Sequence, residues 1–261
     1  MRAIGFDAVN IYNSPADLSL SGAGVASKNS KFNSPAISKN NNSTISFSSN
    51  RWIQNFSGNS LLLSVDNFRL LFNSIGVEDI KVYDETPSDS PLDIIGSHYL
   101  SFGLSKGYDY ESYTFGLGAN FLYSHLFTED LHALTFDLGL KKKISDNFRI
   151  GILGKNLSHK ESSVPKSYAI GCSLYNVSTN TEVLLDYNHS SIYKNGFHFG
   201  LIQKVKLFNI NAGYSTYESR TTFSSGIEVS VNKKYHFLYS ILSIRDSNLG
   251  LSHYFGIEIA I

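Results

Sequence analysis

The sequence predicts an all-β fold: an antiparallel transmembrane β-barrel of about 14 strands, with an N-terminal hatch segment in its lumen. Three observations support this prediction. Apolar residues alternate with polar ones at a period of two, the alternating runs are about ten residues long, and short turn signals separate them. A tilted strand that crosses a bilayer needs about 9–11 residues, whereas strands of soluble sheets are commonly about 5–6 residues long.

Composition excludes several other classes of protein. The 261 residues contain 22 Lys and Arg against 22 Asp and Glu, so the chain lacks the excess of positive charge that phosphate binding requires, and no nucleic-acid partner is expected. The single Cys172 excludes a disulfide framework and a thiolate metal cluster. No run approaches the roughly 20 apolar residues of a membrane-spanning helix. Aromatic residues make up 13%, too many for a disordered chain.

The chain divides into an N-terminal hatch or plug segment, residues 1–42, and an outer-membrane β-barrel, residues 43–261. Residues 1–6 contain no apolar stretch followed by a cleavage site, so we expect no complete signal peptide in this sequence. Residues 7–42 break the alternation and are rich in small residues, which would let their backbone pack closely inside a lumen. A disordered N-terminal tail is the alternative.

The strands follow from residue 43 onward. In the clearest one, six apolar residues from Tyr113 to Tyr123 form one face, and Leu122 is the exception on the polar face. Turn signals such as Asp66-Asn67 and Lys194-Asn195-Gly196 imply an antiparallel meander. An even number of strands fits a closed bacterial barrel. The predicted strands are 43–54, 59–66, 68–76, 94–107, 111–125, 131–144, 147–157, 166–176, 181–191, 196–205, 207–217, 220–231, 235–245 and 249–261.

The polar faces decide between a soluble barrel and a membrane barrel. They are rich in Gly, Ser, Thr and Asn and poor in the Lys and Glu that coat soluble sheets. Small polar residues suit a narrow, partly filled lumen, which favours an apolar exterior in contact with outer-membrane lipid. The predicted lumen-facing residues are Thr135, Asp137, Asn209, Asn211, Ser224 and Glu228.

A second irregular stretch runs from Glu78 to Asp93. Six acidic residues face a single Lys81 there, and the stretch is predicted to be a long exposed loop. Calcium binding is the alternative, but the Asp-x-Asp-x-Asp-Gly spacing of a calcium loop does not occur.

The sequence gives no sign of catalysis, a metal site or a cofactor. Its eight histidines are scattered, and neither a His-x-x-x-His helix motif nor a Gly-x-Ser-x-Gly elbow occurs. Ser252-His253 is a candidate for a lipid-acting pair, but adjacent strand residues point to opposite faces. We therefore predict that the protein is not an enzyme, with an acyl-modifying enzyme as the least favoured reading.

Two N-terminal stretches carry a family resemblance. Residues 18–26, Leu-Ser-Leu-Ser-Gly-Ala-Gly-Val-Ala, followed by Phe32-Asn33-Ser34-Pro35-Ala36, resemble the N-terminal signature of PorV/PorQ-like outer-membrane proteins, which are related to FadL-type transporters. The likeness continues through residues 116–120, 137–139 and 149–157 to the final strand. The hatch motif would consist of Gly22, Gly24, Asn33, Pro35 and Ala36.

The resemblance implies a fold, a location and a function. It implies a fourteen-stranded barrel in the bacterial outer membrane, acting without catalysis as a scaffold or receptor in protein export of the type IX secretion kind. Its partners would be membrane lipid and other envelope or secretion-system proteins. The alternative is a FadL-like transporter of small hydrophobic molecules.

Overall fold

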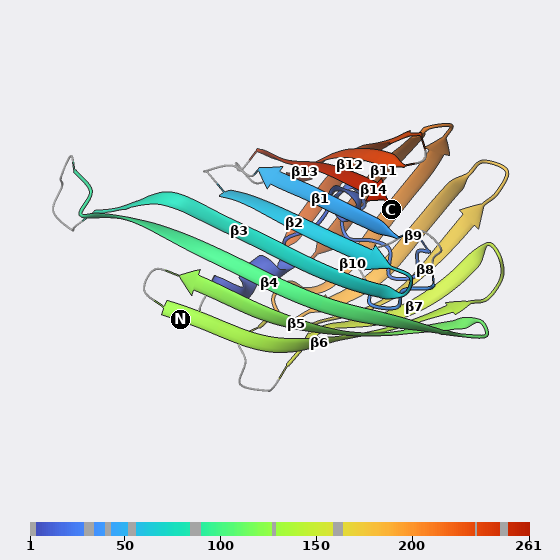
Figure 1. Cartoon of the computed structure of the whole chain (residues 1–261), viewed down its shortest axis with the longest axis horizontal. Helices are drawn as coiled ribbons and strands as arrows, with labels where there is room; N and C mark the ends of the chain where they lie inside the picture. The colour runs from blue at the N-terminus through green and yellow to red at the C-terminus, as the bar shows by residue number, and fades with distance from the viewer. Residues whose placement is uncertain are drawn as a thin grey trace.

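The computed structural model is a closed antiparallel barrel of fourteen strands (Figure 1). It describes residues 4–28, 34–39, 43–51, 56–83, 90–126, 129–158, 164–232, 234–245 and 250–261. Two short helices precede the strands, η1 (Ile4–Asn10) and α1 (Pro15–Ser19). The strands are β1 (Thr44–Arg51), β2 (Phe56–Val65), β3 (Phe68–Val82), β4 (Asp93–Tyr110), β5 (Tyr113–Leu126), β6 (Glu129–Lys143), β7 (Phe148–Leu157), β8 (Ser167–Asn176), β9 (Thr181–Ser190), β10 (Lys194–Val205), β11 (Phe208–Tyr217), β12 (Arg220–Val231), β13 (Tyr235–Ile244) and β14 (Leu251–Ala260).

The first and last strands close the ring. β1 pairs with β14 from Thr44↔Ala260 to Arg51↔His253 and with β2 on its other side. Every other strand pairs with its neighbours in the sequence. The connections from β2 to β3, β4 to β5, and so on around one end of the barrel have two to four residues. We call this the short-turn end, and the opposite end, with connections of up to ten residues, the long-loop end.

The strands β3 and β4 project beyond the rest of the barrel at the long-loop end (Figure 1). The prediction of a loop from residue 78 to residue 93 is therefore wrong at both ends, because β3 runs to Val82 and pairs there with Asp93 of β4. A ribbon that leaves the wall is wetted on both faces, so its sequence does not need to alternate. The acidic residues 84, 85 and 89 lie outside the described residues.

The alternation has the polarity that the sequence predicts. Phe115, Leu117 and Phe121 point outward and are 45%, 57% and 51% exposed, whereas Thr135 and Asn211 point inward and are buried. An apolar exterior around a polar interior is the pattern of a barrel in lipid. Among the described residues, no helix has the length and apolar character to cross a membrane.

Arginine at an outward position tests this exterior. Leu185, 49% exposed, lies in the middle of β9, and Leu185→Arg should reduce the free energy of unfolding by about 2–4 kcal/mol, the cost of a cation at the bilayer midplane. Ile210, 50% exposed, is the third residue of β11 after a short turn, so Ile210→Arg should cost about 0–1 kcal/mol. Urea unfolding in lipid vesicles measures both, and equal losses would contradict the lipid-facing assignment.

Candidate functional site

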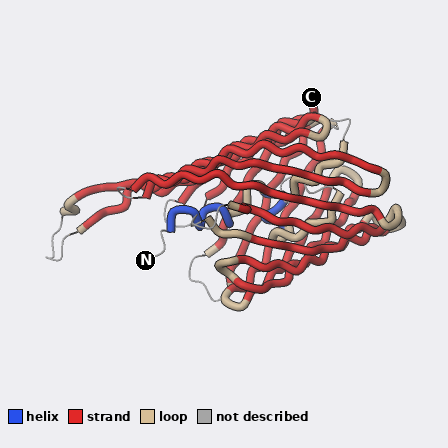
Figure 2. Tube along the Cα trace, turned by 90° about the horizontal axis from the view of Figure 1, so that it is seen from below, coloured by secondary structure: helices blue, strands red, loops and turns tan. Residues whose placement is uncertain are grey.

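The N-terminal segment packs against the inner wall of the barrel over its described residues, 4–28 and 34–39. The two short helices lie among the strands rather than outside them (Figure 2). The helix α1 contacts β11 to β14, and η1 contacts β4 and β5. Next to α1, the carbonyl of Asn13 accepts hydrogen bonds from the Ser48 and Ser60 hydroxyls of β1 and β2. The segment therefore reaches strands on opposite sides of the closure between β1 and β14.

Local sequence explains the start and end of α1. The Ser14 hydroxyl caps the helix by accepting from Asp17 N at 3.1 Å, and Pro15 occupies a first-turn position that needs no N–H donor. The helix ends after Ser19, where Ser21 at φ +49° and Gly22 at φ +77° turn left-handed. Burial raises the pKa of the Asp17 carboxyl to about 6, although the charges of Lys155 and Arg69 oppose the shift.

Nine glycines of the wall face the N-terminal segment, and we call them the glycine belt. A Cβ at Gly107 or Gly116 would overlap the backbone of Ile37 or of Pro35 and Ala36. At Gly226 a Cβ would lie 2.6 Å from the Cβ of Ser19. Glycine within a strand permits such close approach of another backbone. The belt consists of Gly107, Gly116, Gly139, Gly151, Gly171, Gly200, Gly213, Gly226 and Gly256.

Three charged side chains of the wall bind backbone groups of the same segment. The Asp186 carboxylate accepts from Gly24 N at 2.6 Å and from Val25 N at 3.0 Å. The Lys141 ammonium donates to the carbonyl of Ser27 at 2.9 Å, and Arg69 donates to the carbonyl of Ser34 at 3.2 Å. All three side chains are buried, so these charge-assisted bonds compensate both the charges and the irregular backbone.

The structure places four of the five residues of the predicted hatch motif against the inner wall. Gly22 and Gly24, at φ +77° and +132°, adopt backbone conformations that favour glycine. Pro35 and Ala36 lie against the glycine belt, and Ile37 N closes a tight turn onto the Pro35 carbonyl at 2.8 Å. Asn33 lies outside the described residues. The motif thus contacts the wall, and its role as a hatch stays a prediction.

The lumen toward the long-loop end contains an apolar cluster. Phe6 of η1 and Val164 of the β7–β8 connection are buried there against side chains of β3 to β5. Leu122, the exception to the alternation of β5, belongs to this cluster and is 1% exposed. Three smaller buried apolar clusters join the N-terminal segment to the wall elsewhere in the lumen, around Leu18, Leu20 and Val25. The buried members are Phe6, Ile75, Tyr99, Leu122 and Val164.

The wall beside this cluster is interrupted. β6 pairs with β7 only from Phe136↔Leu157 to Lys143↔Arg149, with a register shift near Asp137. In the described part of the chain, residues 129–135 therefore have a strand partner on the β5 side alone. At the end of the interruption nearer the short turns, Asp137 of β6 links the neighbouring strands β5 and β7. Its carboxylate accepts hydrogen bonds from Asn156 N at 2.8 Å and from the Asn120 amide at 3.0 Å.

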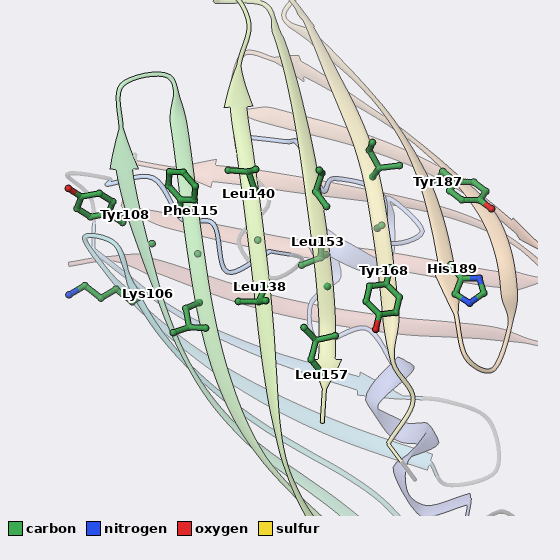
Figure 3. A pocket seen from close by; sticks show the side chains of 18 residues that line it. Lys106, Tyr108, Phe115, Leu138, Leu140, Leu153, Leu157, Tyr168, Tyr187 and His189 are labelled. Atoms are coloured by element: carbon green, nitrogen blue, oxygen red, sulfur yellow. The ribbon is translucent and has the colours of Figure 1, made fainter. Parts of the chain in front are cut away.

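Between the interruption and the short-turn end, the outer face of the barrel carries an apolar groove of about 970 Å³ (Figure 3). Two rows of outward side chains cross the strands β4 to β9 and border it, and the register of the strands defines each row. The first row is Tyr108, Phe115, Leu140, Ile152, Ile170 and Tyr187. The second row is Lys106, Leu117, Leu138, Gly154, Tyr168 and His189.

Sequence reasoning missed both the cluster and the groove. One signal for the cluster was available, since Leu122 breaks the alternation of its strand. The groove depends on which outward residues become neighbours across six strands, and that register is a property of the closed barrel.

Neither the Ser252-His253 pair nor His236 forms a catalytic triad within the described residues. Ser252 is buried, whereas His253 on the next position pairs with the Tyr239 hydroxyl at 2.9 Å. His236 contacts both Ser230 and Glu228, but through the same nitrogen, Nδ1. A Ser-His-acid catalytic triad requires the carboxylate and the serine hydroxyl to bind different nitrogens of the imidazole ring. The described residues contain no group of three or more His, Cys, Asp or Glu able to hold a metal ion.

Comparison with solved structures gives the fold. The chain is similar to the CymD monoaromatic hydrocarbon channel, with a TM-score of 0.70 and 11% identity over 95% of this chain and 97% of that one. It is also similar to the toluene transporters TbuX of Ralstonia pickettii and TodX of Pseudomonas putida, with TM-scores of 0.64 and 0.62, both at 11% identity over 95% of this chain and 97% and 96% of theirs. No family model and no curated protein sequence matches the chain. The barrel therefore has the fold of outer-membrane hydrocarbon channels.

Proposed function

We propose that the protein is an outer-membrane channel for small hydrophobic molecules, with monoaromatic hydrocarbons as the first candidates. The observation that carries this proposal is the apolar cluster of the lumen, which lies directly beside the interruption between β6 and β7. The solved structures with the same fold transport or conduct such hydrocarbons, which supports this alternative over the export scaffold that the sequence resemblance implies.

The proposed path runs from the long-loop end into the apolar cluster and then sideways into the bilayer. In outer-membrane barrels the short turns face the periplasm and the longer loops face outward, so a ligand from outside meets the cluster first. Phe6 and Val164 fill this space and would have to move. A path along the barrel axis toward the short-turn end would bring an apolar molecule to the buried charges of Lys141 and Asp186. A sideways exit brings it into the hydrocarbon core of the bilayer instead.

In this proposal, residues 1–42 act as the hatch. The described part of the segment is held by the glycine belt and by three charged side chains, which suits a plug that keeps ions and water from crossing while hydrocarbons leave sideways.

Phe6→Ala tests the path. Vesicles with lipopolysaccharide in the outer leaflet slow the entry of hydrocarbons, so entry of a fluorescent monoaromatic probe reports the channel. We expect the reconstituted protein to raise the entry rate, and Phe6→Ala to raise it severalfold further, because removing the ring vacates part of the cluster.

The control is Phe47→Ala, since Phe47 lies on the outer face of β1 and is 50% exposed. It should leave the rate unchanged. Entry at the rate of protein-free vesicles would overturn the transport proposal. Recovery of secreted proteins with the purified barrel would then favour the export scaffold.

A further inference from the structure

We propose that the outer groove binds one acyl chain of a phospholipid whose phosphate contacts Lys106. Whereas the proposed hydrocarbon path begins in the lumen, the groove lies on the exterior of the wall, since outward side chains border it. Its occupant therefore belongs to the bilayer, and the assignment does not depend on transport.

The shape of the groove fits a single extended chain. It crosses six strands, and at a spacing of about 4.8 Å its five intervals give a length of roughly 24 Å. The wall between its two rows consists of inward-facing positions such as Gly107, Gly116 and Gly139, so only backbone lies between the rows on the outer face there. The rest of the lining is mainly apolar, and its polar atoms in Figure 3 are the hydroxyls of Tyr108, Tyr168 and Tyr187 and the ring nitrogens of His189.

The charge at one end fits an anionic headgroup. Lys106 is exposed and faces outward beside Phe68, with its ammonium 4.6 Å from the centre of that ring. Gly107 N, the next residue, donates to the carbonyl of Asn67 in the β2–β3 turn at 2.8 Å. Lys106 thus lies close to the short-turn end, where the phosphates of one leaflet are expected. A cation at this level and an apolar groove leading away from it complement a phospholipid better than a neutral hydrocarbon or a second copy of the barrel.

Gly154 provides the test, because it is the one position in the two rows without a side chain. A Cβ there would lie 3.4 Å from Leu157 Cδ1 and 3.7 Å from Tyr168 Cδ1, which is ordinary van der Waals contact. Its φ is not in the left-handed region, so strand geometry accepts other residues. Gly154→Leu should therefore fold normally and fill the groove.

The experiment measures phospholipid retained by the delipidated full-length protein during titration with phosphatidylglycerol, by native mass spectrometry from detergent. Wild type should retain one tightly bound phospholipid, and Gly154→Leu should weaken that binding at least tenfold. Lys106→Gln, a surface change that leaves the groove intact, should weaken it severalfold. The control Ala212→Leu, at an exposed outward position on β11, should bind as wild type.

Three results would overturn the proposal. The first is equal phospholipid retention by wild type and Gly154→Leu. The second is binding that Lys106→Gln leaves unchanged, which would indicate a neutral apolar ligand. The third is a dimer that Gly154→Leu dissociates, which would make a second copy of the chain the occupant.

Discussion

Deletion of residues 255–261 should abolish insertion of the barrel into membranes. These residues form most of β14, which pairs with β1 from Thr44↔Ala260 to Ser49↔Phe255 and with β13 from Tyr235↔Ile259 to Tyr239↔Phe255. Their removal leaves two strand edges in hydrocarbon, where each unpaired backbone group costs several kcal/mol. A folded barrel in vesicles resists trypsin and migrates differently on gels when it is not boiled, and the truncated chain should do neither.

A matched control separates the backbone from the side chains. Alanine at Phe255, Ile257 and Ile259 removes outward apolar surface but keeps every backbone pairing of β14. This triple variant should insert with reduced stability. Insertion of the truncated chain at the level of wild type would contradict a closed barrel in lipid.

The alternation of the sequence was sufficient to predict the strands wherever one face meets lipid and the other meets the lumen. It located fourteen strands, most of them within about three residues of the observed bounds. It failed for residues 78–82, because Glu78 and Lys81 belong to a ribbon that extends past the wall. Alternation reports a difference between two environments, and water on both faces removes that difference.

The interior was less predictable because it depends on contacts across the barrel. The sequence indicated that the polar faces are rich in glycine, yet the belt is recognisable only when the N-terminal segment is seen passing over those positions. Likewise, Asp186 is an isolated carboxylate in the sequence, more than 160 positions from the two amides that it binds. Leu122 was the one local sign of the apolar cluster.

Gly116→Val should release residues 34–37 from the wall without disturbing the barrel. Gly116 has no left-handed φ, so valine suits the strand, but its Cβ would overlap the backbone of Pro35 and Ala36. Overpacking of this kind costs about 1–3 kcal/mol, and a shift of that size changes a two-state population by about 5- to 150-fold. The segment itself would bear the strain, because β5 is held by hydrogen bonds to β4 and β6 over its whole length.

Two measurements follow the release. Limited proteolysis of the inserted protein should cut near residues 34–39 at least fivefold faster in the variant, since docked segments open rarely. Ion conductance in planar bilayers should also rise, toward the value reached by deleting residues 12–40. The control Gly154→Val makes the same substitution at an outward position of β7, where a Cβ meets only ordinary contacts, and should change neither measurement. Faster proteolysis with unchanged conductance would show that the segment packs on the wall without closing the lumen, and the hatch role would then be wrong.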